Sequence, residues 1–301
     1  MLKKPERLKK GDKIGIFVPS SPVRDSFRQD GLDRLRRMGY VPVEVPNILG
    51  RREFLAKPVD ENLEDIQILL NRSDIKALWA ARGGYGSNHL LPGLDRLRIN
   101  KPKIVLGSSD VSYLLWYLLD HFKMVVFYGP MAYSALAEDR VNLDQLESVL
   151  NGRAEGMTIE GLTLIPGRTR GLLTGGCLSN MVSLIGTRFF PNIRRRILLL
   201  EDRGEKPYRL DRMFWQLGQL GIFRKISGLV MGQFPECFRD KREKHRFFSR
   251  ITEYLPDTGV PVVVDLPLGH GERLFTVPLG VEMEMDAGNS GRLIIRENGV
   301  G

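Results

Sequence analysis

The sequence predicts an α/β domain with a parallel sheet, followed by a β-rich α+β domain. Over residues 13–128, short apolar runs alternate with amphipathic helical segments, as in sheets whose parallel strands are joined by helices. Beyond residue 150 the alternation becomes irregular, and from Val260 onwards short strand-like segments dominate. A chain of 301 residues is long enough for two such domains, each with its own core.

The first domain is predicted over residues 1–150. Its strands are expected over 13–18, 40–45, 75–80, 104–106 and 124–128, and its helices over 27–38, 61–70, 110–118 and 143–150. The run Ile104, Val105, Leu106 is wholly apolar, which indicates a strand buried on both faces of a parallel sheet. The carboxyl ends of such strands are where open α/β sheets place their active sites.

The second domain is predicted over residues 171–301, after a segment over 151–170 that is rich in glycine and charge. This segment is expected to be a linker, and the alternative is that it forms the first irregular strands of a domain. We expect helices over 178–185, 208–220 and 244–255 and strands over 197–201 and 229–231. Four later segments, PVVVDLP, FTVPLG, VEMEM and RLIIR, are predicted as short strands. The second domain should therefore contain more strand than helix.

Composition excludes several classes of protein. A hydrophobic content of 42% and a charged content of 27% are typical of a globular domain. No apolar run approaches the roughly 20 residues that a membrane span needs, and the basic N-terminus lacks the apolar core of a signal peptide. Two cysteines, Cys177 and Cys237, make neither a disulfide framework nor a metal cluster. We expect a cytoplasmic protein.

The formal net charge of +9 raises the possibility of a nucleic-acid partner. The basic residues are scattered, with small clusters at 194–196 and 239–244, and no nucleic-acid-binding motif accompanies them. A solvated surface, or attraction for acidic small substrates, is the favoured explanation. A non-enzymatic ligand-binding or nucleic-acid-binding protein remains the alternative of a different class.

Ser108 and Ser109 lie on the predicted turn between the strand at 104–106 and the following helix. A serine on such a turn has the geometry of a nucleophile elbow, with backbone N–H groups of the helix directed towards it. The alternative is a helix N-cap, a position that serine and aspartate both favour. Ser109 is the candidate nucleophile, although Gly107-Ser108-Ser109-Asp110-Val111 lacks the second glycine of a GxSxG motif.

The loop Arg82–Gly86 follows the neighbouring predicted strand and so should lie at the same sheet edge. Its glycines allow close backbone approach and positive φ, so its N–H groups can join that of Asp110 in an oxyanion hole. The alternatives are a plain turn or a phosphate-binding loop, but the loop matches neither GxxxxGK[ST] nor GxGxxG.

The second half of the chain contains a candidate orienting carboxylate and a candidate base. Glu201 ends the apolar strand ILLLE, where a carboxylate needs a partner, either a histidine or an arginine such as Arg203, Arg209 or Arg212. His270, one of four histidines, is flanked by Gly269 and Gly271 in a loop that leaves its ring free to reach a cleft. The order Ser109, Glu201, His270 is that of a nucleophile, carboxylate and base triad, although His270 taken alone could be an ordinary loop residue.

These motifs together resemble the serine LD-carboxypeptidases, the murein tetrapeptide carboxypeptidase family that also contains the microcin C immunity hydrolases. The resemblance spans nearly the whole chain. It rests on GDKIGIFVPSSP at 11–22, RGGYGS at 82–87, GSSD at 107–110, GGCLS at 175–179, LLLED at 198–202 with YRLDRM at 208–213, and GH at 269–270 with VPLG at 277–280.

The resemblance implies a flavodoxin-like first domain, a homodimer and a metal-free serine peptidase. It places the nucleophile at Ser109, the orienting carboxylate at Glu201, the base at His270, and the oxyanion hole at the N–H groups of Asp110 and Gly84. Cys177 stands where the family usually has asparagine. We expect Cys177 to be a packed small residue, because no histidine is near it in sequence.

The implied activity is hydrolysis, in cell-wall peptide recycling, of the bond between an L-diamino acid and D-Ala in murein tetrapeptides, with neither nucleic acid nor membrane as a partner. The alternative within the family is a hydrolase of acyl-adenylate antibiotics. That activity would require an aromatic platform for a base, whereas Trp79, Trp116 and Trp215 are expected to be core or helix residues.

Overall fold

The computed structural model describes residues 2–133, 142–255, 259–271 and 274–301. The chain forms two compact units, and neither is a single continuous stretch. The first unit comprises Met1–Arg153, Leu274–Gly280 and Asn298–Gly301, and the second comprises Ala154–Arg273 and Val281–Glu297. The division after residue 153 lies close to the expected end of the first domain at 150, but each unit also contains a later segment of the chain.

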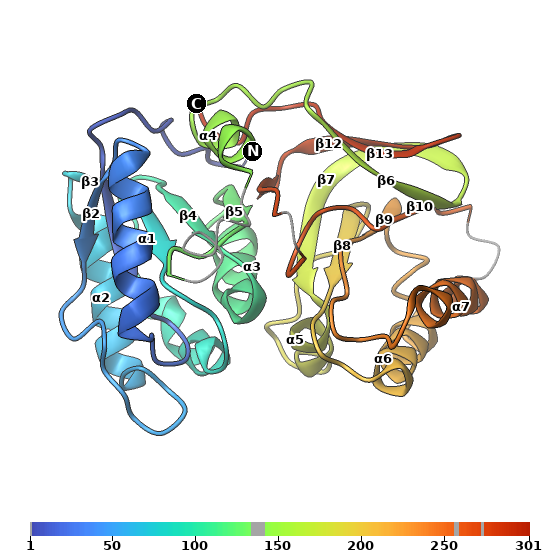
Figure 1. Cartoon of the computed structure of the whole chain (residues 1–301), viewed down its shortest axis with the longest axis horizontal. Helices are drawn as coiled ribbons and strands as arrows, with labels where there is room; N and C mark the ends of the chain where they lie inside the picture. Colours follow the sequence, from blue (N-terminus) through green and yellow to red (C-terminus); the bar gives the residue numbers. More distant parts are fainter. Residues whose placement is uncertain (1, 134–141, 256–258, 272–273) are drawn as a thin grey trace. The chain divides into compact units, whose positions relative to one another are not determined.

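The first unit is built on a six-stranded sheet (Figure 1). Its spatial order is β11 (Val277–Leu279), β5 (Val126–Tyr128), β4 (Ile104–Gly107), β3 (Ile75–Ala80), β1 (Lys13–Phe17) and β2 (Val41–Glu44). Strands β1 to β5 are parallel and follow the order 2-1-3-4-5 of flavodoxin-like sheets. The predicted α/β class and parallel sheet are confirmed.

Helices cover this sheet as the alternating pattern predicts. Helix α2, the 3₁₀ segment η1 and α3 contact one another in a continuous layer, whereas α1 packs beside β2. Helix α3 is buried along nearly its whole length, which explains its uniformly apolar sequence. The helical segments are α1 (Asp25–Arg37), α2 (Val59–Asn71), η1 (Ser87–Arg96), η2 (Ser109–Val111), α3 (Ser112–Asp120) and α4 (Leu143–Leu150).

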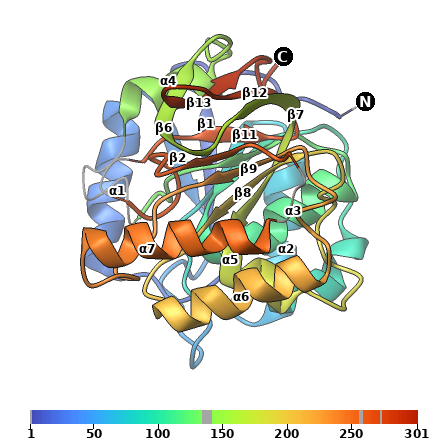
Figure 2. The same cartoon turned by 90° about the vertical axis from the view of Figure 1, so that its right-hand side faces the viewer.

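The second unit is a closed seven-stranded barrel with helices on its outside (Figure 2). Its strands are, in spatial order, β10 (Val262–Val264), β6 (Thr158–Ile165), β13 (Gly291–Ile295), β12 (Glu282–Ala287), β7 (Gly167–Cys177), β8 (Ile197–Glu201) and β9 (Gly228–Met231). The pairs β7–β8, β8–β9 and β9–β10 are parallel, and the other four are antiparallel.

The helices of the second unit agree with the predicted ones to within a few residues. Helices α6 and α7 lie side by side along the barrel (Figure 2). Pro207 begins α6 at a position where its missing N–H costs nothing, and the Asp240 side chain caps α7 by accepting the Glu243 N–H. The segments are α5 (Leu178–Ser183), α6 (Pro207–Gln219), α7 (Lys241–Ile251) and η3 (Thr252–Tyr254).

Two expectations about domain organisation are corrected. Residues 151–170 are not a linker but, as in the alternative, form strands, since they contain β6 and the first part of β7. Their charged residues form ion pairs across the barrel strands, such as Arg168 with Asp286 at 3.1 Å and Arg170 with Glu284 at 2.7 Å. The alternation of charge and small residues therefore reflects strands with one solvated face.

The second correction concerns FTVPLG, which was assigned to the second domain. Its strand β11 pairs antiparallel with β5 of the first sheet, with Val277 opposite Tyr128 and Leu279 opposite Val126. Local sequence predicts a strand here but carries no information on which sheet receives it.

No helix within the described residues is long and apolar enough to cross a membrane.

Candidate active site

The turn after β4 presents Ser109 in a strained backbone conformation. Ser109 has φ +56°, a left-handed value that a non-glycine residue adopts only when its surroundings enforce it. Gly107 permits the sharp turn, since a Cβ there would lie 2.8 Å from the Val111 side chain. The Ser109 N–H donates to the Tyr128 hydroxyl at 3.2 Å. Ser108, at the N-cap position of η2, makes no side-chain capping bond within the described chain, so this turn resembles a nucleophile elbow more than a cap.

The glycine loop after β3 lies against this turn. A Cβ added to Gly83 would be 3.2 Å from the Cβ of Ser109, so the backbone of the loop closely approaches the candidate nucleophile. Gly84 has φ +112°, which only glycine adopts readily, and a Cβ there would crowd the hydroxyl of Ser21. The Tyr85 N–H donates to the same Ser21 hydroxyl at 3.0 Å. The backbone between β3 and η1 is therefore set by the absence of side chains at 83 and 84.

The Asp110 side chain joins the serine turn to the glycine loop. Asp110 is 4% exposed, and its Oδ2 accepts the backbone N–H of Ser87 at 2.8 Å. Ser20 and Ser87, whose hydroxyl oxygens lie 2.8 Å apart, complete the cluster. Burial raises the pKa of Asp110 above its ordinary value, although hydrogen bonds from Ser20 and Ser87 oppose this effect. A buried carboxylate thus fixes the loop that carries Gly84 relative to Ser109.

Glu201 and His270 meet in the second unit. Glu201 ends β8 with its side chain fully buried, and its Oε2 lies 2.6 Å from Nδ1 of His270. Because Glu201 occupies Nδ1, Nε2 is the ring nitrogen that would exchange a proton with a nucleophile, as in a carboxylate–histidine couple. Two of the arginines expected as alternative partners for Glu201 pair with other carboxylates. Arg203 pairs with Glu236 at 2.5 Å and Arg209 with Glu205 at 3.6 Å.

The charges around this couple stabilise the protonated form of the His270 imidazole. Burial alone would lower the pKa of His270, but the charge of Glu201 and its hydrogen bond, with a contribution from Asp202, raise it above the ordinary value. Asp202 is itself buried, and burial together with the charge of Glu201 raises its pKa to about 6. The backbone N–H groups of Ser179 and Arg203 donate to Asp202 at 2.8 and 2.9 Å and oppose that shift.

The glycines on either side of His270 have no room for a side chain. Gly269 has φ +99°, and a Cβ there would overlap the carboxylate of Glu201. A Cβ at Gly271 would overlap the side-chain amide of Gln233. The loop backbone therefore fits tightly between the end of β8 and the segment after β9. Within the described residues, no group of three or more His, Cys, Asp or Glu side chains is arranged to hold a metal ion.

The structure thus brings the predicted site residues together in two sets. Ser109, Asp110 and Gly84 lie at the carboxyl edge of the first sheet, and Glu201 and His270 lie at the end of β8 in the barrel. Sequence reasoning missed the Asp110 side chain as an anchor, together with Ser20 and Ser87. The available signal was the placement of the motifs VPSSP, RGGYGS and GSSD after three neighbouring parallel strands.

Two models of known protein families match most of the chain. Residues 14–129 match the model of the LD-carboxypeptidase N-terminal domain, and residues 170–285 match that of the LD-carboxypeptidase C-terminal domain. The chain belongs to the serine LD-carboxypeptidase family.

Individual relatives of this LD-carboxypeptidase extend over nearly its whole length. The murein tetrapeptide carboxypeptidase of Pseudomonas aeruginosa is 32% identical over 89% of this chain and 91% of its own. A solved muramoyltetrapeptide carboxypeptidase from Oxalobacter formigenes is 28% identical, covers 93% of this chain and 98% of its own, and has a TM-score of 0.79. The microcin C7 self-immunity protein of Escherichia coli is 26% identical over 93% of this chain and 92% of its own.

Cys177 of this LD-carboxypeptidase packs against the carboxylate next to Glu201. Its side chain is buried, with Sγ 3.8 Å from Asp202 Oδ1 and 3.4 Å from the Ser179 hydroxyl. Burial, reinforced by the charges of Asp202 and Glu201, raises the pKa of the Cys177 thiol well above its ordinary value. A thiol held neutral in this way is a poor nucleophile, which agrees with its expected packing role.

Proposed function

We propose that this LD-carboxypeptidase hydrolyses the bond between the L-centre of a diamino acid and the terminal D-Ala of murein tetrapeptides. The observation that carries the proposal is the combination of a strained serine at a strand-to-helix turn with a carboxylate–histidine couple 2.6 Å apart. The relatives named for murein peptides supply the substrate class.

In the proposed reaction, His270 Nε2 accepts the hydroxyl proton of Ser109 while Oγ attacks the carbonyl carbon of the scissile bond. The N–H groups of Asp110 and Gly84 stabilise the oxyanion. The protonated His270 then donates to the departing amine of D-Ala. Water, deprotonated by the same imidazole, hydrolyses the acyl-enzyme and regenerates the Ser109 hydroxyl. The chemistry requires Ser109 Oγ to reach His270 Nε2 during the reaction.

Incubation of the purified protein with murein tri-, tetra- and pentapeptides tests the proposal. Release of D-Ala from the tetrapeptide alone is the expected result. The same sample should be labelled at Ser109 by a serine-directed phosphonate. Absence of both D-Ala release and labelling, with salt-dependent binding to DNA or RNA, would instead indicate the non-enzymatic alternative.

A second candidate function, hydrolysis of acyl-adenylate antibiotics, is favoured by one observation. Trp79 and Trp116 are buried, but Phe54 and Tyr85 form an exposed edge-to-face pair with ring centroids 6.4 Å apart. Tyr85 directly follows Gly84 and also contacts His89, its hydroxyl lying 3.0 Å from Nε2. An aromatic pair beside the candidate oxyanion loop could stack on a nucleobase, a group that a murein tetrapeptide does not contain.

The Phe54→Ala variant distinguishes the two candidates, because Phe54 is 72% exposed and its loss leaves the core intact. If murein peptides are the substrate, kcat/KM for the tetrapeptide should stay within a few-fold of the unmodified protein. If acyl-adenylates are the substrate, KM for a hydrolysable aminoacyl-adenylate analogue should rise by about tenfold or more, since aromatic–base stacking contributes about 1–3 kcal/mol.

We further propose that the enzyme acts in the cytoplasm as a homodimer, as expected for its family, and that it binds neither nucleic acid nor membranes. Light scattering of the purified protein gives the mass directly. A dimer should have twice the 34.2 kDa of one chain. Cell fractionation with a cytoplasmic marker enzyme tests the compartment.

A further inference from the structure

A pocket lies at the amino-terminal ends of strands in the first sheet, whereas Ser109 follows the carboxyl-terminal end of β4. Its volume is about 470 Å³, and its wall includes Ile75 at the start of β3 and Lys103 immediately before β4. The three peptide units of β4 between Ile104 and Gly107 span about 10 Å, so this amino edge is separated from the serine turn. All the residues that line the pocket belong to the first unit.

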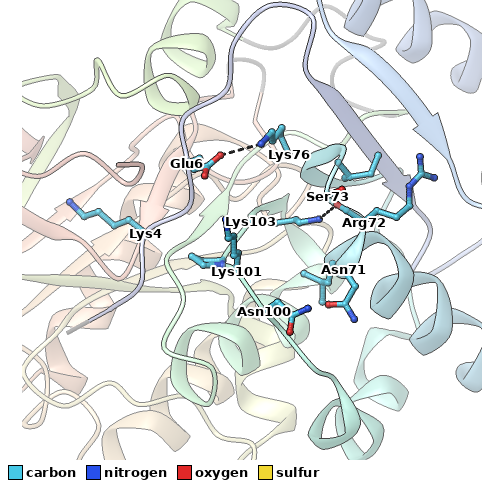
Figure 3. A pocket seen from close by; sticks show the side chains of 12 residues that line it. Lys4, Glu6, Asn71, Arg72, Ser73, Lys76, Asn100, Lys101 and Lys103 are labelled. Carbon is cyan, nitrogen blue, oxygen red and sulfur yellow. Dashed lines mark hydrogen bonds and ion pairs between the residues drawn. The ribbon is translucent and has the colours of Figure 1, made fainter.

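The charge of this pocket is strongly positive. Its lining contains Lys4, Arg72, Lys76, Lys101 and Lys103 but a single acid, Glu6. Figure 3 shows the Lys4 side chain extending away from the other cations. The ion pair between Lys76 and Glu6 has an N···O distance of 3.2 Å with both side chains exposed, at 41% and 70%. Such a pair contributes little and can be exchanged for a ligand.

Lys103 is a buried cation that the fold holds in place. Its ammonium donates to the carbonyls of Leu69, at 2.8 Å, and Arg72 at the end of α2. Lys103 lies beside Arg72 in Figure 3. It therefore neutralises the negative end of that helix dipole, which would otherwise repel an anion. Burial lowers the pKa of Lys103 to about 8, so most of the population is charged at neutral pH. Two of its three N–H donors are used by these carbonyls.

The remaining donors favour a phosphate over a carboxylate. The one arginine, Arg72, is already engaged through Nε and Nη2 by Asp74, at 3.0 and 2.8 Å, which occupies the fork that suits planar carboxylates. Lys101 makes no hydrogen bond or ion pair with any described residue, and lysines bind phosphate as point charges. Three neutral donors, Asn71, Ser73 and Asn100, and three apolar side chains, Leu70, Ile75 and Pro102, complete the wall.

We propose that this pocket is a second ligand site that binds a small organic phosphate, with the phosphate between Lys76, Lys101 and Lys103 and the organic part against the apolar wall. The site is independent of the proposed peptidase reaction, because it lies at the amino-terminal ends of the strands. A volume of about 470 Å³ is within the ordinary range for small-molecule pockets.

Calorimetric titration with phenyl phosphate and with phthalate, two anions of similar size and charge, tests the proposal. Phenyl phosphate should bind more tightly than phthalate. The double variant Lys76→Gln/Lys101→Gln should weaken phenyl phosphate binding about tenfold or more. The matched variant Lys241→Gln/Arg242→Gln, which removes two charges from the exposed start of α7, should leave it unchanged.

Equal weakening in the two double variants would overturn the proposal, because it would reflect net charge alone. Equal or tighter binding of phthalate would overturn the phosphate assignment, and absence of phenyl phosphate binding would overturn the site. Release of D-Ala from murein tetrapeptide should be unchanged in Lys76→Gln/Lys101→Gln, so failure of this proposal and failure of the proposed peptidase function are distinguishable.

Discussion

The nucleophile and the base of the proposed triad are held by different means. Ser109 is positioned by backbone: a left-handed turn, a glycine loop in close contact and a buried aspartate that anchors the loop. The ring of His270 is held by one side chain, the fully buried Glu201, whose oxygen lies 2.6 Å from its Nδ1, and the loop around it is tightly packed. The first arrangement fixes geometry and the second fixes both geometry and charge. Substitutions on the two sides should therefore fail in different ways.

The largest expected effect is loss of the nucleophile. Ser109→Ala should lower kcat for D-Ala release by about 10⁶, the size seen when a serine protease loses its nucleophile. Ser108→Ala is the matched control, because Ser108 is the adjacent buried serine on the same turn. It should retain at least about a tenth of the activity. Near-normal turnover by Ser109→Ala would remove Ser109 from the mechanism.

Glu201→Gln should lower kcat by about 10⁴, since an amide cannot hold the imidazole in the tautomer that accepts the serine proton. Glu236→Gln is the control, because Glu236 is also near enough to interact with His270 but is exposed and pairs with Arg203. It should change kcat less than about tenfold. Similar losses in the two variants would mean that Glu201 acts only through its negative charge.

The pH profile tests the charge that Glu201 contributes. Because Glu201 raises the pKa of His270 above its ordinary 6.5, the neutral imidazole needed as a base should be lost at a higher pH than usual. The acid limb of kcat/KM should therefore have its midpoint above that value and fall about tenfold per pH unit below it. In Glu201→Gln, burial still lowers the pKa of His270 and only the smaller contribution of Asp202 opposes it, so the midpoint of the residual activity should move to lower pH. A midpoint that stays in place would contradict the assignment.

Asp110→Asn tests whether the buried Asp110 side chain holds the glycine loop in place beside Ser109. The amide should disturb the bond from the Ser87 N–H to Asp110 and let the glycine loop shift, costing about 10–100-fold in kcat. KM should change little if the loop serves the oxyanion rather than ground-state binding. Asp33→Asn, on the exposed face of α1, is the control. A rise in KM with unchanged kcat would show that Asp110 serves substrate binding instead.

The smallest effect is expected at Cys177. Cys177→Ala should keep kcat within about threefold, because the buried thiol donates only a weak hydrogen bond to Asp202. Iodoacetamide should not label the folded protein at Cys177 or at Cys237, whose pKa burial raises to about 11. Rapid labelling of Cys177 with loss of activity would indicate a second reactive group at the end of β7.

The sequence predicted those features that depend on local patterns. Alternating apolar runs located β1 to β5, and the motifs around Ser109, Glu201 and His270 located residues that the structure places in turns and at strand ends. Long-range pairing was not predictable in this way. The strand at Val277–Leu279 could have joined either sheet, and the charges of residues 151–170 make sense only once β7 lies beside β12.

The anchor at Asp110 was missed for a related reason. Its partners, Ser20 and Ser87, lie 90 and 23 residues away along the sequence, and they meet only because β1, β3 and β4 are neighbours in the sheet. The exposed pair Phe54 and Tyr85 was also not predicted, because its two residues come from different segments of the chain. Phe54 is 72% exposed, and an exposed phenylalanine has no periodic pattern to mark it.

The return of β11 to the first sheet has a consequence for biosynthesis. On the ribosome, the serine-bearing unit cannot complete its sheet until residue 279 has emerged, by which time the barrel strands up to β10 have already been made. Until then β5 is an unpaired edge of apolar residues, which invites association with other chains. Shortening the chain after residue 153 would make that temporary state permanent, so the unit that carries Ser109 should not be obtainable as a well-behaved fragment.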